Sequence, residues 1–129
     1  ALPWLRKSDA ARIINIASTE GLGATPGDTP YVAAKTGVTG LTRGLAVDLG
    51  EEGITVNCIC PGPIDTPMMD AELEWFPDPV EARKGAIERV PLKRFAMPDE
   101  VARAILYFAT DATYATGSVF SFDGGTTAV

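Results

Sequence analysis

The sequence contains no histidine and only two cysteines, Cys58 and Cys60. A Ser-His-Asp triad and a Cys-His dyad both use histidine as the general base, so the composition excludes these two kinds of site. Two thiols without histidine also leave a zinc ion short of its usual ligands, and we expect no metal site. Cys58 and Cys60 stand two positions apart in an apolar run and share one face of an expected strand, which is a poor arrangement for a disulfide. We therefore expect reduced thiols in the core.

Basic residues and long apolar runs are also scarce. The 129 residues include 11 Lys and Arg against 17 Asp and Glu, which gives a net charge of −6. Binding to nucleic acid requires a basic face that this sequence does not show. No apolar run is long enough to span a bilayer, and no basic segment precedes an apolar one as in a secretion signal. We expect no nucleic-acid partner, no membrane partner and a cytoplasmic location.

The composition that remains is typical of a globular α/β protein, since 46% of the residues are hydrophobic and the chain has 13 glycines and 10 prolines. Its length suits one domain with a moderate core. Short β-branched runs predict buried strands at residues 12–17 and 54–60. Apolar residues at intervals of three and four predict an amphipathic helix over 31–49, starting near Thr29 and Pro30. This order of elements predicts a right-handed βαβ unit with parallel strands.

The second half of the chain departs from the sheet and then returns to it. Residues 63–92 are rich in proline and predict an excursion with one or two short helices, which is a natural lid because it follows the carboxyl end of a strand. Its acidic residues are interpreted as a solvated face: Asp65, Asp70, Glu72 and Glu74. A helix over 98–110 and a strand over 117–122 follow, and Asp123-Gly124-Gly125 ends that strand.

Tyr31 and Lys35 are the residues best suited to bond-breaking chemistry. Their spacing of four places them on one face of a helix, about one turn apart. A nearby ammonium favours the phenolate, so Tyr31 could exchange protons near neutral pH. Ser18 falls at the end of the first strand and could donate a hydrogen bond to the reacting oxygen. Taken alone, the tyrosine and lysine would be ordinary surface residues, and it is Ser18 together with Pro61-Gly62 that favours a catalytic role.

Four motifs in this order resemble the carboxyl-terminal half of the classical short-chain dehydrogenase/reductase (SDR) family. They are Ile14-Asn15-Ile16-Ala17-Ser18, Tyr31-x-x-x-Lys35, the segment from Val56 through Asn57 and Pro61-Gly62-Pro63 to Thr66, and Asp123-Gly124-Gly125. The resemblance covers nearly the whole chain. It implies that residues 1–129 form a single partial domain, the carboxyl-terminal part of a doubly wound Rossmann-type parallel sheet that is incomplete without its amino-terminal strands.

The same resemblance implies an NAD(P)-dependent oxidoreductase that interconverts an alcohol and a carbonyl by hydride transfer. Ser18, Tyr31 and Lys35 would be the catalytic set. The residues that would bind the cofactor, NAD or NADP, are Tyr31, Lys35, Pro61, Gly62, Ile64 and Thr66. Further implications are a small-molecule alcohol or carbonyl substrate, a lid over 63–92 and a homo-oligomer, either dimer or tetramer. Asn57 is interpreted as a structural residue, and Thr66 could be only a turn residue.

The chain departs from the family in lacking a glycine-rich phosphate-binding turn. Gly21-x-Gly23-x-x-Pro26-Gly27 is no substitute, because Pro26 takes the place of a glycine and Pro30 interrupts the start of the helix. Without further strands, residues 12–17 would expose a hydrogen-bonding edge and one apolar face. A truncated, non-catalytic SDR remnant or interaction-only fragment is therefore the alternative to an enzyme. A related epimerase or dehydratase could use the same tyrosine and lysine, although Pro61-Gly62 favours the classical branch.

Overall fold

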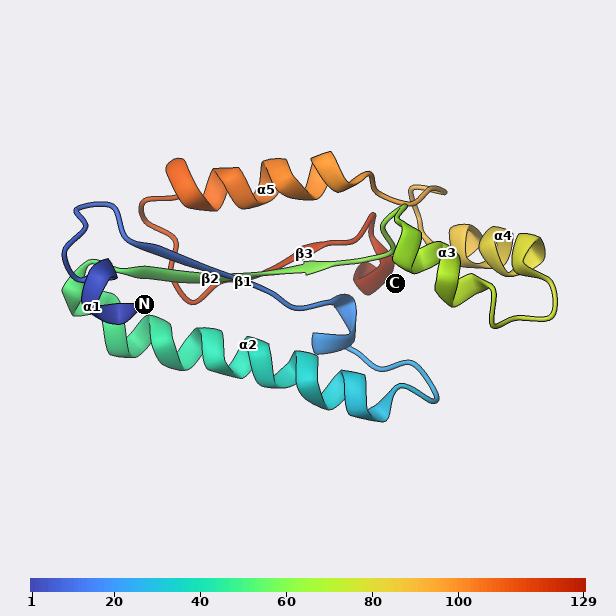
Figure 1. Ribbon diagram of the computed structural model, residues 1–129, viewed down its shortest axis with the longest axis horizontal. Coiled ribbons are helices and arrows are strands. Elements are labelled where there is room, and N and C mark those ends of the chain that lie inside the picture. Colours follow the sequence, from blue (N-terminus) through green and yellow to red (C-terminus); the bar gives the residue numbers. More distant parts are fainter.

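The computed structural model describes residues 1–129 as a three-stranded parallel sheet with helices on both faces (Figure 1). The strands are β1 (Arg12–Ile16), β2 (Thr55–Pro61) and β3 (Val119–Phe122), in the order β1-β2-β3. In their register, Ile14 lies opposite Asn57 and Ile59 lies opposite Phe120. Because all three strands are parallel, their carboxyl ends meet at one edge of the sheet.

The helices form two covering layers and a projection. They are α1 (Leu2–Leu5), α2 (Thr29–Leu49), α3 (Pro67–Leu73), α4 (Pro79–Arg89) and α5 (Pro98–Thr110), with short 3-10 turns η1 (Thr19–Gly21), η2 (Gly50–Glu52) and η3 (Thr126–Ala128). The long helix α2 covers one face of the sheet and α5 covers the other, while α3 and α4 lie beyond the carboxyl ends of the strands (Figure 1). No helix combines the length and the apolar character needed to cross a membrane.

Most predicted elements are present within one or two residues of their expected bounds. The structure confirms a partial Rossmann-type α/β sheet, with one helix over 98–110 and the predicted start of α2 at Thr29 and Pro30. The last strand begins at Val119 instead of at residue 117, because Gly117 has a φ of 73° and is not extended. The expected loop after Ser18 includes the turn η1, which the Ser18 side chain caps.

The core lies on both faces of β2, whose residues are almost all buried. Val56, Cys58 and Cys60 face α2 and pack in its two apolar clusters. Ile59 faces the opposite side and packs against Phe108 of α5. A strand covered on both faces needs apolar residues at successive positions, which explains its continuous apolar run. Both cysteines are free and buried, which confirms the prediction of reduced core thiols.

Asn57 is the polar exception in this strand, and it has a structural role. Its side chain is 1% exposed. Its Nδ2 donates to the Ala115 carbonyl at 2.7 Å, and its Oδ1 accepts from the Ser118 N–H at 3.1 Å. A buried amide with both ends bonded ties the turn before β3 to the middle of the sheet.

Strand β1 lies at one edge of the sheet and pairs only with β2, as expected. The prediction that one of its apolar faces would be exposed is wrong. Ile13 packs on the cluster under α2 and Ile14 packs on the cluster under α5, so each face is half-buried. Only Ile16, at the end of the strand, is largely open at 43% exposure. The helices on both sides extend far enough over this edge to cover it in part.

Candidate active site

Two strand ends and the start of α2 meet at one edge of the sheet. Ser18 follows β1, and Pro61 is the last residue of β2. Helix α2 runs back along the sheet, so its first two turns, which carry Tyr31 and Lys35, lie at this same edge (Figure 1). Ligands of open α/β sheets bind beyond the carboxyl ends of the strands. The predicted site residues therefore come from three elements that converge where such a ligand would bind.

Lys35 lies between Tyr31 and the end of β1. Its Nζ is 5.4 Å from the centroid of the Tyr31 ring, within the range of a cation–π contact. The same ammonium donates to the Ile16 carbonyl at 3.4 Å. Tyr31 is 47% exposed, and its hydroxyl makes no hydrogen bond with the rest of the chain. An ammonium thus stands beside a phenol whose oxygen is open to an external partner.

Ser18 is held close to α2 by the turn that it caps. Its Oγ accepts from the Glu20 N–H at 3.2 Å, which leaves the hydroxyl proton free for another acceptor. The turn packs directly on α2, since a Cβ added to Gly21 would stand 2.9 Å from the Lys35 carbonyl oxygen. Glycine is needed at that contact because any side chain would separate the two elements. No hydrogen bond joins Ser18 to Tyr31 or Lys35.

The segment after β2 is held by two backbone hydrogen bonds to Ala96. The Ala96 N–H donates to the Pro63 carbonyl at 3.0 Å, and the Asp65 N–H donates to the Ala96 carbonyl at 2.8 Å. Ile64 stands between these bonds, and its own N–H has no acceptor within the chain. This N–H, which has no partner in the chain, is available to a ligand carbonyl.

Thr66 has a local structural duty in the same segment. Its Oγ1 accepts from the Met69 N–H at 3.3 Å and thereby caps α3. The hydroxyl also donates to the Ile64 carbonyl at 3.5 Å. Gly62 continues the ladder of β2, because its N–H donates to the Phe122 carbonyl at 3.0 Å. The turn reading of Thr66 thus has direct support in the structure.

Cys60 lies near this edge but does not supply a nucleophile. Burial, followed by the neighbouring Cys58 thiol, raises the pKa of Cys60 to about 11. The reactive form of a cysteine is the thiolate, so a thiol with so high a pKa stays protonated and inert at neutral pH.

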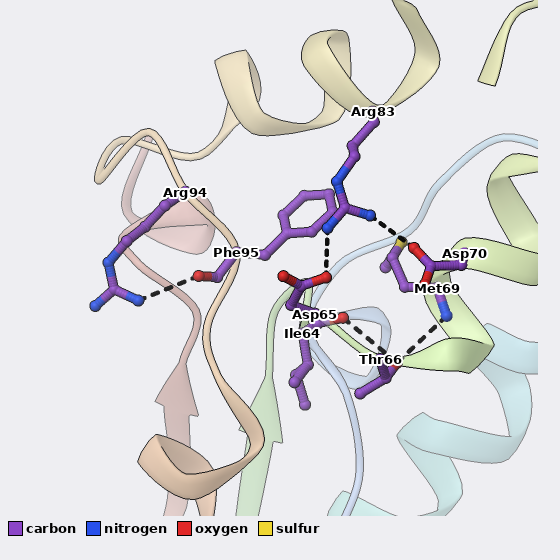
Figure 2. A network of polar contacts seen from close by, with 8 residues as sticks. All are labelled: Ile64, Asp65, Thr66, Met69, Asp70, Arg83, Arg94 and Phe95. Carbon is purple, nitrogen blue, oxygen red and sulfur yellow. Dashed lines mark hydrogen bonds and ion pairs between the residues drawn. The ribbon is translucent and has the colours of Figure 1, made fainter. Parts of the chain in front are cut away.

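Arg83 is the residue of this region that sequence reasoning missed. Its guanidinium pairs with Asp65 and, at 2.8 Å, with Asp70 (Figure 2). The hydrogen bond to Asp65 is the largest cause of a raised pKa for Arg83. The side chains of Asp65 and Asp70 are 42% and 62% exposed, as expected of a solvated face, and both also pair with Arg83. No sequence signal pointed to these pairs, because the partners lie on separate elements whose packing sets the contact.

A hollow of about 620 Å³ lies between α3 and α4 and is lined by both apolar and charged side chains. Leu73, Val80 and Ile87 are its apolar lining residues. None of Ser18, Tyr31 and Lys35 borders it, so this hollow is separate from the converging strand ends.

Known proteins resemble this chain in sequence and in fold. Residues 1–127 match the protein family described as Enoyl-(Acyl carrier protein) reductase. The chain is 41% identical to the 3-oxoacyl-(acyl-carrier-protein) reductase FabG of Thermotoga maritima over 96% of this chain and 48% of that protein. It is 42% identical to the D-beta-hydroxybutyrate dehydrogenase of Rhizobium meliloti over 99% of this chain and 52% of that protein. The chain thus spans about half the length of the curated relatives it matches.

Solved structures give the same result. The crystal structure of levodione reductase superposes with a TM-score of 0.94 at 35% identity, covering 99% of this chain and 51% of that one. An actinorhodin polyketide ketoreductase variant with NADPH superposes with a TM-score of 0.85 at 38% identity, over 89% of this chain and 46% of that one. From the matched residues and the shared fold, the chain belongs to the short-chain dehydrogenase/reductase family.

Proposed function

We propose that this chain carries the catalytic residues of an NAD(P)-dependent oxidoreductase that interconverts an alcohol and a carbonyl group of a small molecule. The observation that carries the proposal is the position of Lys35, whose ammonium is 5.4 Å from the Tyr31 ring and 3.4 Å from the Ile16 carbonyl. This places a positive charge beside a phenol with a free hydroxyl, at the edge where Ser18 lies. The names of the relatives, which are reductases and dehydrogenases, support the same reaction class.

The residues at this edge fit a nicotinamide cofactor. The unpaired Ile64 N–H is a donor suited to a carboxamide oxygen. Pro61 and Gly62 would border the nicotinamide ring, Lys35 and Tyr31 would bind the hydroxyls of its ribose, and Thr66 would lie close by. When bound, NAD or NADP supplies the chemistry of hydride transfer. The ketoreductase with NADPH is the solved relative that supports this class of cofactor.

In the proposed mechanism, the chain's own residues handle the proton and the orientation of the substrate. The Tyr31 oxygen takes the hydroxyl proton of an alcohol and returns it when a carbonyl is reduced. The Lys35 ammonium stabilises the phenolate that this requires. The Ser18 hydroxyl donates a hydrogen bond to the substrate oxygen and holds the reacting carbon in place.

We extend the proposal to residues 63–92 as the substrate lid, because α3 and α4 lie beyond the carboxyl ends of the strands (Figure 1). We also propose a homo-oligomer. The family resemblance supports this, and α2 carries exposed apolar side chains, such as Leu41 at 54% and Val47 at 82% exposure, that a second copy could contact.

Replacement of Tyr31 by Phe in the full natural protein tests this function. We expect turnover of alcohols or ketones with NAD(H) or NADP(H) to fall by at least about 100-fold, because the general acid–base group is lost. Cofactor affinity, measured by fluorescence titration, should stay within about twofold, since most cofactor contacts remain. Tyr114→Phe is the matched control, because Tyr114 is fully exposed and lies in the loop before β3, at the amino ends of the strands.

Near-normal turnover by the Tyr31→Phe variant would contradict the assignment. The alternative, a non-catalytic remnant, predicts no turnover by the unmodified protein in the same assay.

A further inference from the structure

Helices α3 and α4 have little apolar anchorage. Helix α4 has no buried residue, and α3 buries only Leu73. Both helices lie outside the layers that α2 and α5 form on the sheet (Figure 1). With so few buried side chains, the hydrophobic effect by itself fixes the position of this pair only loosely. Specific polar contacts must then contribute much of its placement.

Arg83 of α4 makes the principal polar contacts between this pair and the sheet edge. One end of its guanidinium donates to Asp65, just after β2, and the other donates to Asp70 of α3 at 2.8 Å (Figure 2). The Cζ of the same guanidinium lies over the Phe95 ring, 5.0 Å from its centroid. The Arg83 side chain is 32% exposed, so these contacts are partly shielded from water. One side chain of α4 therefore contacts three other segments: the chain after β2, α3 and the residue before Ala96.

Asp65 lies inside the segment that the proposed function assigns to the cofactor. It stands between Ile64, whose N–H is unpaired, and Thr66, which caps α3. Its own N–H donates to the Ala96 carbonyl at 2.8 Å. The carboxylate of Asp65 is held by Arg83, so this residue is fixed at both its backbone and its side chain.

Phe95, the ring that Arg83 contacts, is held in place by burial and by its neighbours. Phe95 is buried at 5% exposure and directly precedes Ala96. Arg94 donates to the Phe95 carbonyl at 3.1 Å and pairs with Glu100 at 2.7 Å (Figure 2 shows the first of these contacts). Arg83 thus rests on a fixed aromatic ring while it holds Asp65.

We propose that Arg83 is a positioning residue that holds the Ile64–Thr66 segment in the geometry required to bind the nicotinamide cofactor and couples that segment to α4. The inference rests on the proposed function, because only there is the Ile64–Thr66 segment a cofactor contact. Arginine suits this task better than lysine, since its planar group can bind two carboxylates and stack on a ring at the same time.

Cofactor titration of a double-mutant cycle in the full natural protein tests this inference. The variants are Arg83→Met, Asp65→Asn and the double variant, titrated with NADH and with NADPH. We expect each single variant to bind the cofactor about fivefold more weakly, the scale of a partly exposed ion pair. The double variant should also lose only about fivefold, because both changes break the same contact. The KM for the cofactor should rise by more than kcat falls.

Lys84→Met is the matched control, because Lys84 is the neighbouring cation on α4 and pairs only with Glu81 of the same helix, at 3.7 Å. Its cofactor affinity should equal that of the unmodified protein. The inference is overturned if Arg83→Met binds as tightly as Lys84→Met, or if the losses of the two single variants multiply in the double variant.

Arg83→Lys, together with Asp65→Asn, keeps the test decisive if Arg83→Met does not fold. Arg83→Lys retains the charge and should give an intermediate loss, and unchanged binding by a folded Asp65→Asn variant would by itself overturn the inference. An unmodified protein that binds neither NADH nor NADPH would overturn the proposed function along with it. Normal binding by the unmodified protein with no loss in the variants would overturn only the role of Arg83.

Discussion

Single side chains in this chain join elements that are far apart in sequence. Lys35 reaches from α2 to both Tyr31 and the end of β1. Asn57 ties β2 to the turn before β3. Cys60 behaves as an apolar residue of the core, because burial and the Cys58 thiol raise its pKa to about 11 and keep the thiol neutral. The pKa of Cys60 has a direct consequence for stability at alkaline pH.

Folding keeps Cys60 protonated, so the free energy of unfolding should fall at alkaline pH. The pKa of Cys60 rises from its ordinary value of 9.0 to about 11 in the folded chain. A raised folded pKa means that the contribution is fully present below pH 9 and is lost as the pH rises through about 11. Cys60→Ala removes this dependence, although the cavity costs stability at every pH. Urea unfolding from pH 8 upward should show the gap between the two proteins narrowing above pH 9, whereas parallel curves would contradict the assignment.

At the scale of elements, the contact between η1 and α2 sets the position of Ser18. The turn approaches the helix so closely that Gly21 has no room for a Cβ beside the Lys35 carbonyl. Gly21 therefore serves close packing of the turn on the helix. Both Ser18 and Lys35 depend on this one contact for their relative placement.

Gly21→Ala should destabilise the chain and impair catalysis together. Its Cβ would stand 2.9 Å from a backbone oxygen, so the turn must move away from α2. Overpacking of this kind costs about 1–3 kcal/mol of unfolding free energy. Gly23→Ala is the matched control, because the nearest atom to its Cβ would be 4.0 Å away. Urea unfolding of both variants measures the difference, and equal stability of the two would argue against a tight contact.

At the scale of the whole molecule, the order of the strands makes β2 the centre and β1 an edge. The Ala17 N–H donates to the Ile59 carbonyl, so by alternation Ile13 and Asn15 also face β2. The backbone groups of Ile14 and Ile16 then face the open edge. Lys35 uses this edge when it donates to the Ile16 carbonyl.

Hydrogen exchange of the 129-residue chain should follow this alternation. We expect the amides of Ile13 and Asn15 to be protected, because they bond to β2, and those of Ile14 and Ile16 to exchange rapidly. The two sets alternate along one strand, so each serves as the control for the other. Amide exchange measured by NMR resolves them residue by residue, and equal protection of both sets would show that another strand or a second copy pairs with this edge.

The elements of the fold and the pairing of Tyr31 with Lys35 in the candidate site follow from local sequence. The four-residue spacing of Tyr31 and Lys35 on a helix places them together, because a helix turns once in about 3.6 residues. The period of two in a strand likewise puts Cys58 and Cys60 on one face. Patterns of this kind depend only on neighbours along the chain, which is why the sequence predicts them well.

The sequence by itself determined the α/β class, the helix that carries Tyr31 and Lys35, and the family motifs. Only the tertiary structure decided that β1 is half covered on both faces, that Ile64 bridges to Ala96, and that Arg83 holds Asp65 and Asp70. The physical reason is that backbone periodicity acts over a few residues. Contacts between separate elements depend on how the packed core sets those elements against one another.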